Sequence, residues 1–297
     1  MNLYKNGNYT VMIMNDGTKV RYTKEDSFIP SFAENCDVKI TDMCSQGCPF
    51  CYEGCTKFGA HANLFKYPFL LNSLHPYTEM ALNGNDLDHP QLEDFLISLK
   101  RKKVFANITV NQNQFMTNFD KLKELQDNGL VYGIGVSLIS GEINDDVIHH
   151  MRLLKNIVLH AIVGILTEKD ISKLKNKGIK ILLLGYKNLK RGVSYMESNS
   201  HQVMNNMSYL YEHVYEMTDW FDVVSFDNLA IEQLDVKRIV PEDKWDEFYM
   251  GDDGHYTFYI DMVKGEFAKN SLSQDRYPIG DMTIDDMFKF ILEKNQD

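Results

Sequence analysis

Four of the five cysteines of this 297-residue chain fall within one short segment, TDMCSQGCPFCYEGC, which runs from Thr41 to Cys55. Three of them have the spacing Cys44-x3-Cys48-x2-Cys51, and Cys55 follows shortly afterwards. Thiols gathered in this way have three chemical uses, because they can bind zinc, form disulfides or bind an iron–sulfur cluster. The choice among these uses determines the chemistry that we expect of the protein.

Disulfides and zinc both fit this cysteine segment poorly. The start of the chain lacks the basic residues and apolar core of a secretion signal, so we expect a cytoplasmic protein, in which disulfides rarely persist. A structural zinc site uses four ligands, usually as two separated pairs, and here only Cys55 or His61 could supply the fourth. An iron–sulfur cluster held by three cysteines of one loop leaves one iron open to bind another molecule.

The composition is that of an acidic globular protein. Of the 297 residues, 44% are hydrophobic and 25% are charged, and 42 acidic against 31 basic residues give a net charge of −11. A surface this negative repels nucleic-acid phosphates unless basic residues gather in one patch, so we expect no nucleic-acid partner. No apolar run approaches the roughly 18 residues of a membrane span, so we expect no membrane partner.

A repeating pattern of strands and helices would position the cysteine segment. Six short runs rich in Val, Ile and Leu are typical of strands buried on both faces, and the helices between them indicate βαβ units and a parallel sheet. The cysteine segment leaves the first strand at its carboxyl end, where such sheets carry their chemistry. The expected strands lie in residues 37–43, 79–86, 104–111, 131–140, 157–166 and 179–187, and the expected helices in 89–103, 116–129, 144–156 and 168–178.

Other elements flank this pattern on both sides. Residues 9–23 contain two β-type runs around Asn15-Asp16-Gly17, a combination that suits a tight hairpin. After a helical pattern at 201–220, residues 221–234 predict a strand and loop, residues 255–271 an antiparallel pair, and residues 283–294 a last helix. We therefore divide the chain into an N-terminal β-hairpin extension (1–35), a β/α region (36–215) and a C-terminal α+β cap (216–297).

The segment CSQGCPFC, placed after a first strand and followed by the βα pattern, resembles the cluster motif of the radical S-adenosylmethionine (SAM) superfamily. The resemblance implies an α/β fold, namely a partial (β/α)6 TIM-like barrel. It implies that Cys44, Cys48 and Cys51 bind an oxygen-sensitive [4Fe–4S] cluster whose open iron binds SAM, with Phe50 near the adenine. It also implies an electron donor such as flavodoxin or ferredoxin, cleavage of SAM to a 5′-deoxyadenosyl radical, and hydrogen abstraction from an organic substrate.

The same resemblance suggests which residues hold SAM. The family's Gly-Gly-Glu segment after the second strand corresponds here to Asn83, Gly84 and Asn85, and Asp86 is left to supply the negative charge. Alternate residues of the third strand share one face and add polar contacts. The remaining expected contacts are Asn107, Thr109 and Asn111 on the third strand, Ser137 on the fourth, and the backbone at Gly164 and Gly185.

Polar residues at the expected barrel mouth are candidates for substrate binding. They lie in the loop after the cluster motif, after the sixth strand, and in residues 221–234. Cys55 is either structural or a hydrogen-atom donor to a substrate radical. The candidates are Glu53 and His61, then Tyr186, Lys187 and Arg191, and finally Ser225, Asp227, Asn228, Glu232 and Gln233.

The C-terminal stretch YTFYIDMVKGEF…YPIGDMTIDDMF resembles the SPASM/twitch-type cap of radical SAM enzymes that modify peptides and proteins. In those caps cysteines hold auxiliary clusters, and no cysteine follows Cys55 here, so a cluster-free version is implied. A peptide or protein side chain is therefore the first expectation for the substrate. The alternatives are a nucleotide or small metabolite, activation of a glycyl-radical partner, and a non-catalytic iron–sulfur scaffold.

Overall fold

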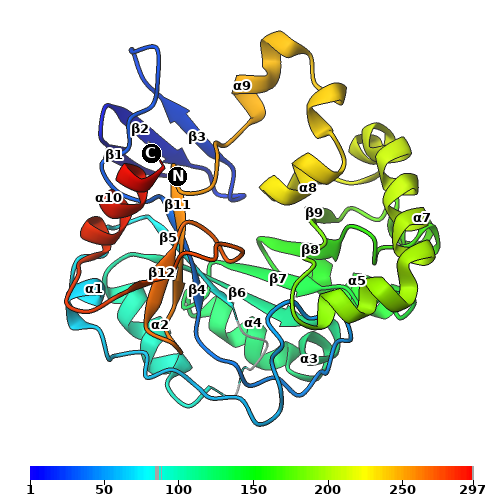
Figure 1. The fold of residues 1–297 in the computed structure, drawn as a ribbon, viewed down its shortest axis with the longest axis horizontal. Coiled ribbons are helices and arrows are strands. Elements are labelled where there is room, and N and C mark those ends of the chain that lie inside the picture. The colour runs from blue at the N-terminus through cyan, green and yellow to red at the C-terminus, as the bar shows by residue number, and fades with distance from the viewer. Residues whose placement is uncertain (84–86, 88, 296–297) are drawn as a thin grey trace.

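The computed structural model describes residues 1–83, 87 and 89–295 and contains two β-sheets (Figure 1). The larger sheet has ten strands in the order β10-β9-β8-β7-β6-β5-β4-β11-β12-β13. All neighbouring pairs from β10 to β11 are parallel, and the last two pairs are antiparallel. The strands are β4 (Asn35–Lys39), β5 (Glu79–Asn83), β6 (Phe105–Asn111), β7 (Gly133–Ser137), β8 (Ile157–Ile162), β9 (Lys180–Leu184), β10 (Val223–Phe226), β11 (Thr257–Asp261), β12 (Glu266–Ala268) and β13 (Tyr277–Pro278).

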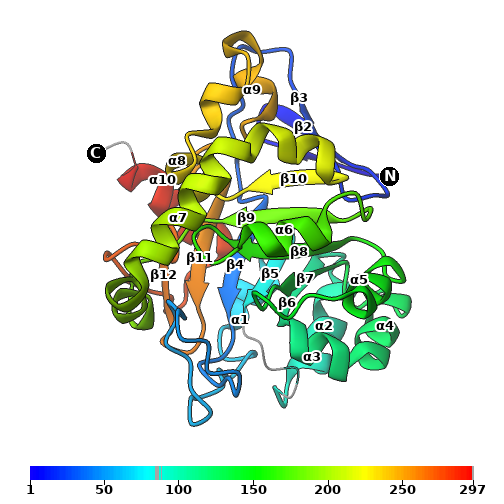
Figure 2. The same cartoon turned by 90° about the vertical axis from the view of Figure 1, so that its right-hand side faces the viewer.

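The six strands expected from the sequence are confirmed as β4 to β9. They stand side by side in chain order, as successive right-handed βαβ units require. The sheet curves strongly, and most helices cover its outer face (Figure 2). Because β10 and β13 form the two edges of the sheet, the described strands make a partial barrel that does not close.

The helices bury apolar residues at helical spacing against this sheet. In α2, for example, Leu92, Phe95 and Leu99 lie on one side and are buried. No helix in the described ranges has both the length and the apolar character needed to cross a membrane. The helices are α1 (Pro68–Asn72), α2 (Leu92–Arg101), α3 (Gln112–Thr117), α4 (Phe119–Asp127), α5 (Asp145–Arg152), α6 (Glu168–Leu174), α7 (Arg191–Trp220), α8 (Asn228–Gln233), α9 (Trp245–Phe248) and α10 (Ile284–Lys294).

The N-terminal segment forms the smaller, antiparallel sheet. It consists of β1 (Asn2–Asn6), β2 (Tyr9–Ile13) and β3 (Lys19–Tyr22) in the order β1-β2-β3. The hairpin expected around Asn15-Asp16-Gly17 is confirmed as β2–β3, closed by a 2.8 Å hydrogen bond from Met14 N to Thr18 O. The sequence did not predict β1, which pairs with β2.

The C-terminal region differs from the sequence expectation in two places. Helix α7 begins at Arg191 rather than His201 and contains one non-helical residue, Asn199. The strand expected within residues 221–234 ends at Phe226, because Asp227 accepts a 2.8 Å hydrogen bond from Ala230 N and caps α8. The expected antiparallel pair is β11–β12, and β11 also pairs in parallel with β4. The main sheet therefore continues across the boundary that we drew at residue 216.

Candidate functional site

A cavity of about 960 Å³ lies on the inner face of the curved sheet. Its wall contains alternate residues of β4 to β10, together with the cysteine loop and the segments that follow β9 and β10. This size is near the upper end of the range for small-molecule pockets. All four cysteines of the motif segment line the cavity: Cys44, Cys48, Cys51 and Cys55.

The cysteine loop is closed at its base by backbone pairing. Thr41 bridges to His61 and Met43 bridges to Thr56, so the chain on either side of the cysteines runs together. Cys44 N donates to Thr56 O at 2.9 Å, which fixes the first thiol at the edge of this pairing. This pairing fixes the base of the cysteine loop at the carboxyl end of β4.

A buried lysine ties the loop to the sheet. Lys39, at the end of β4, is 3% exposed and makes ion pairs with Asp42 at 2.6 Å and Glu53 at 2.8 Å. Asp261, at the end of the neighbouring β11, lies 3.7 Å from the same ammonium. Burial alone works against the charge, but these carboxylates hold the pKa of Lys39 above its usual value. The sequence candidate Glu53 therefore has a structural partner as well as a place in the cavity wall.

Arg191, the first residue of α7, holds the other side of the loop and faces the thiols. Its Nη2 donates to the Cys55 carbonyl at 3.1 Å. The pKa of Cys51 is lowered to about 5, chiefly by hydrogen bonding from the Cys55 thiol and also by the Arg191 side chain. Burial raises the pKa of Cys48, and the neighbouring thiols of Cys51 and Cys44 add to the effect. The thiols are therefore close enough to interact, and a cation stabilises one thiolate.

The cavity also contains most residues that the sequence analysis connected with SAM. Within the described ranges, no three Cys, His, Asp or Glu side chains are arranged to bind a single metal ion. Gly84, Asn85 and Asp86 lie outside the described residues. The expected SAM contacts that line the cavity are Phe50, Asn83, Asn107, Thr109, Ser137 and Gly185.

Five described sequence candidates are not brought to the cavity wall, namely Asn111, Gly164, His61, Glu232 and Gln233. The Gln233 side chain instead accepts from Tyr186 N at 2.8 Å and donates to Tyr186 O at 3.0 Å. Asn111 is buried and caps α3 by accepting from Asn113 N at 2.9 Å. Gly164 has a φ of +87° and faces α7, where an added Cβ would lie 2.7 Å from Val203. His61 bonds to Thr41 at the base of the loop, and Glu232 is exposed on α8. Local hydrogen bonds and helix packing account for the positions of the first three.

The candidates after β9 form a bonded group. Lys187 Nζ donates to Ser271 Oγ at 3.0 Å and lies 4.1 Å from the ring centroid of Tyr52. Burial opposes the charge, yet Tyr52, Asp227 and Asp37 hold the pKa of Lys187 above its usual value. No carboxylate of the described residues lies within ion-pair distance of this ammonium. Lys187 thus presents a positive charge to the cavity.

The remaining substrate candidates have structural bonds inside the wall. Tyr186 donates its hydroxyl to Gly192 O at 2.7 Å. Asp227 Oδ1 accepts from Gly185 N at 2.8 Å in addition to capping α8. Asn228 donates to Asp253 Oδ1 at 2.7 Å. All three line the cavity, so these bonds fix their orientation there.

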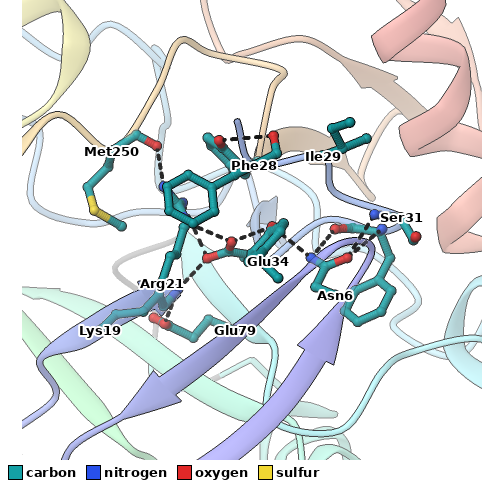
Figure 3. Close-up of polar contacts among 12 residues, drawn as sticks. Asn6, Lys19, Arg21, Phe28, Ile29, Ser31, Glu34, Glu79 and Met250 are labelled. Carbon is teal, nitrogen blue, oxygen red and sulfur yellow. Dashed lines mark hydrogen bonds and ion pairs between the residues drawn. The ribbon is translucent and has the colours of Figure 1, made fainter. Parts of the chain in front are cut away.

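The N-terminal sheet lies at the side of the cavity where the parallel strands begin. Lys19 and Arg21 project from β3 toward two carboxylates of the main sheet region (Figure 3). Arg21 Nε lies 2.8 Å from Glu34 Oε1, and Lys19 Nζ lies 2.8 Å from Glu79 Oε1. The Tyr9 hydroxyl also donates to Glu34, at 2.7 Å. These bonds attach the N-terminal sheet to the first residues of the partial barrel.

Asp37 and His160 are two of the cavity-wall residues that the sequence did not single out. Asp37 stands in the middle of β4 and faces the cavity, where desolvation by the surrounding wall and the charge of Asp253 raise its pKa against the opposing charge of Lys187. His160 stands in β8, where burial lowers its pKa to about 4, so the imidazole is neutral at neutral pH. For His160 the available signal was a single titratable residue inside an otherwise apolar strand, which becomes informative once the inner face of the strand is known. Asp37 gave no such signal, because β4 also contains Lys39.

Comparisons with known proteins identify the fold. The chain matched no protein-family model and no curated protein. SuiB from Streptococcus suis bound to the precursor peptide SuiA aligns with a TM-score of 0.59 at 12% identity, covering 89% of this chain and 65% of that chain. SuiB bound to S-adenosylmethionine aligns with a TM-score of 0.55 at 13% identity, covering 89% and 64%. At this identity the likeness shows a shared fold, and this chain spans about 65% of the SuiB chain.

Proposed function

We propose that this protein is a radical SAM enzyme in which Cys44, Cys48 and Cys51 hold a [4Fe–4S] cluster and SAM binds in the adjoining cavity. The observation that carries the proposal is the position of these three thiols, which follow the first strand of a parallel sheet and face a cavity of about 960 Å³. The likeness to SuiB, whose solved structures include one with S-adenosylmethionine, supports it.

The chemistry of the donor set fits such a cluster. Each thiolate of a cubane binds a different iron, so the cysteines need to surround the cluster rather than converge on one point. Arg191 lies against Cys51, and its buried Nε has no hydrogen-bond partner in the described part of the chain. A buried donor of this kind fits an anionic group in the cavity. When bound and reduced, the cluster supplies the electron that cleaves SAM.

The cavity wall supplies contacts for SAM itself. Phe50 packs edge-on against Tyr195 of α7, with ring centroids 5.7 Å apart, and offers an apolar surface to the adenine. Thr109 and Ser137 offer hydroxyls from neighbouring strands, and Asn83 offers an amide at the end of β5. We also assign the Gly185 backbone to the contacts with SAM. Asn107 donates to Glu79 at 2.9 Å, so its amide is held in place.

The proposed substrate is a peptide or protein side chain. One SuiB structure contains a precursor peptide, and the fold shared with SuiB supports extending this substrate class to the present chain. Lys187 would pair with a carboxylate of the substrate or of SAM, because its present partners are a hydroxyl and an aromatic ring. The same part of the cavity would be shaped by Glu53, Tyr186, Asp227 and Asn228. Cys55, beside Cys51, is the proposed hydrogen-atom donor to a substrate radical.

Anaerobic reconstitution of single-cysteine variants tests the ligand set. The wild type should hold about four iron and four sulfide per chain, and Cys48→Ala should lose most of both, because a ligand is removed. Cys55→Ala is the matched control from the same loop and should retain the full content. Full iron in Cys48→Ala, or its loss in Cys55→Ala, would show that the assignment of ligands is wrong.

A further inference from the structure

His160 is unusual among the residues that line the cavity. Its imidazole makes no hydrogen bond or ion pair within the described part of the chain, although it stands on an inner strand of the sheet. An imaginary Cβ on Gly135, in neighbouring β7, would lie 2.2 Å from Cε1 of the ring and 2.5 Å from Nε2. The ring therefore lies directly over Gly135, in the space that any larger residue would fill. A glycine inside a strand commonly marks such a close approach.

The neighbours of His160 form a polar row across four strands. The backbone register pairs Ser137 with His160, His160 with Leu182, and Leu182 with Ser225. Figure 2 shows the strands concerned, β7 to β10, as successive arrows of the sheet. The side chains of Ser137 and Ser225 also make no hydrogen bond inside the described ranges, and all four residues line the cavity. One cross-strand row thus offers two hydroxyls and an imidazole to whatever occupies the cavity.

His160 and Ser137 are half-buried in the cavity wall and Ser225 is exposed. Because no protein group bonds to these side chains in the described part of the chain, their polar atoms are available to a ligand in the cavity. In this row the end at Ser137 belongs to the proposed SAM contacts, and the other end, at Ser225, lies two strands beyond His160. A group bound at His160 would therefore stand next to SAM. Because burial keeps the imidazole neutral, it offers one acceptor nitrogen and one N–H donor rather than a charge.

We propose that His160 is a substrate-binding residue that accepts a hydrogen bond from an N–H group of the substrate, such as a peptide amide, with Ser225 completing the subsite. Gly135 is a positioning residue in this arrangement, since it leaves the space in which the ring lies. The inference rests on the proposed function for the adjoining SAM site, and it assigns the substrate side of the same cavity.

A pair of small probes tests this role in the cluster-loaded protein with SAM present. Acetyl-alanine N-methylamide carries two N–H groups, and its fully N-methylated analogue carries none. Ligand-observed NMR should show that the wild type binds the first probe about 3 to 10 times more tightly, the value of one net hydrogen bond. His160→Phe keeps an aromatic ring but removes the acceptor, so its preference should fall below about twofold.

Two further variants complete the test. Gly135→Ala should also lose the preference, because the added methyl group displaces the imidazole. His201→Phe makes the same chemical change at an exposed position of α7, so this variant should keep the preference for the probe with N–H groups. An unchanged preference in His160→Phe, or no preference in the wild type, overturns the proposal.

Calorimetry of SAM on the same samples separates this inference from the proposed function. SAM affinity should be the same in the wild type and His160→Phe. A loss of SAM affinity confined to the variant would place the imidazole in the SAM site and overturn its substrate role. A wild type that holds its cluster and does not bind SAM would instead overturn the proposed function, whatever the probes show.

Discussion

A single buried carboxylate, Glu34, bonds the N-terminal sheet to the start of the main sheet. The Glu34 carboxylate is 1% exposed and receives the Arg21 guanidinium at 2.8 Å and the Tyr9 hydroxyl at 2.7 Å, with Lys19 Nζ at 3.6 Å. Removing one member of such a buried group leaves the others with uncompensated charge, which costs more than the pair itself contributes. At the residue scale, Glu34 therefore collects several of the contacts that attach the N-terminal sheet, and the Lys19–Glu79 ion pair adds another.

Glu34→Gln should lower the free energy of unfolding by about 3 kcal/mol, because Arg21 and Lys19 lose a buried anionic partner. Urea denaturation followed by circular dichroism measures this change. Glu25→Gln is the matched control, since Glu25 is exposed and its side chain bonds only to Asn8 within the described residues. The control should change stability by less than about 0.5 kcal/mol. Equal effects of the two variants would contradict the structural role of Glu34.

The neutral state of His160 has a consequence for stability. Its pKa is lowered from 6.5 to about 4, so between these values the unfolded chain binds a proton that the folded protein does not. Stability contributed by the neutral ring is present above pH 6.5 and is lost as the pH falls toward 4. Relative to His160→Phe, the wild type should lose about 1 to 3 kcal/mol between pH 7 and pH 4.5. Urea titrations that show the same change in stability for the two proteins over this pH range would contradict a neutral imidazole at this position.

At the scale of elements, local hydrogen bonds explain why some sequence candidates are absent from the cavity. Asn111 and Asp227 are both polar residues near a strand end, and both cap the helix that follows, but only Asp227 also lines the cavity. The position after a strand suits a ligand contact and a helix cap equally well, so the sequence could not separate the two uses. The strands β4 to β9 were predictable because their apolar runs and intervening helices repeat regularly.

Asp170 shows how one carboxylate can join two elements. It is fully buried, belongs to the capping box of α6 with Thr167, and accepts from Ser140 Oγ at 2.7 Å and Gly141 N at 2.8 Å. Residues 140 and 141 lie in the loop that follows β7, so Asp170 fixes that loop to α6.

Asp170→Asn should destabilise the protein by about 2 kcal/mol, because an amide nitrogen would face donors that now bond to a carboxylate. Chemical denaturation provides the measurement. Glu168→Gln alters an exposed carboxylate in the first turn of the same helix and should have little effect. The predicted role of Asp170 would be wrong if both variants unfolded at the same urea concentration as the wild type.

At the scale of the whole molecule, chain segments far apart in sequence build one cavity. The cysteine loop, the start of α7, the N-terminal sheet and the residues before β11 all contribute to its wall. The strand that precedes the cysteine segment predicted the thiols at the carboxyl end of β4, and the structure brings them to this cavity. His160 and Asp37 could not be predicted, because only the curved sheet determines that their strand faces point inward. The parallel pairing of β11 with β4 was also unpredictable, since it joins residues separated by most of the chain.

The formation of 5′-deoxyadenosine tests the central claim most directly. The cluster-loaded protein, reduced anaerobically with SAM, should produce this compound, as measured by liquid chromatography and mass spectrometry, and Cys48→Ala treated in the same way should produce none. A wild-type sample that holds about four irons per chain and yields no 5′-deoxyadenosine would contradict the account, because the thiols would then hold a cluster without SAM chemistry.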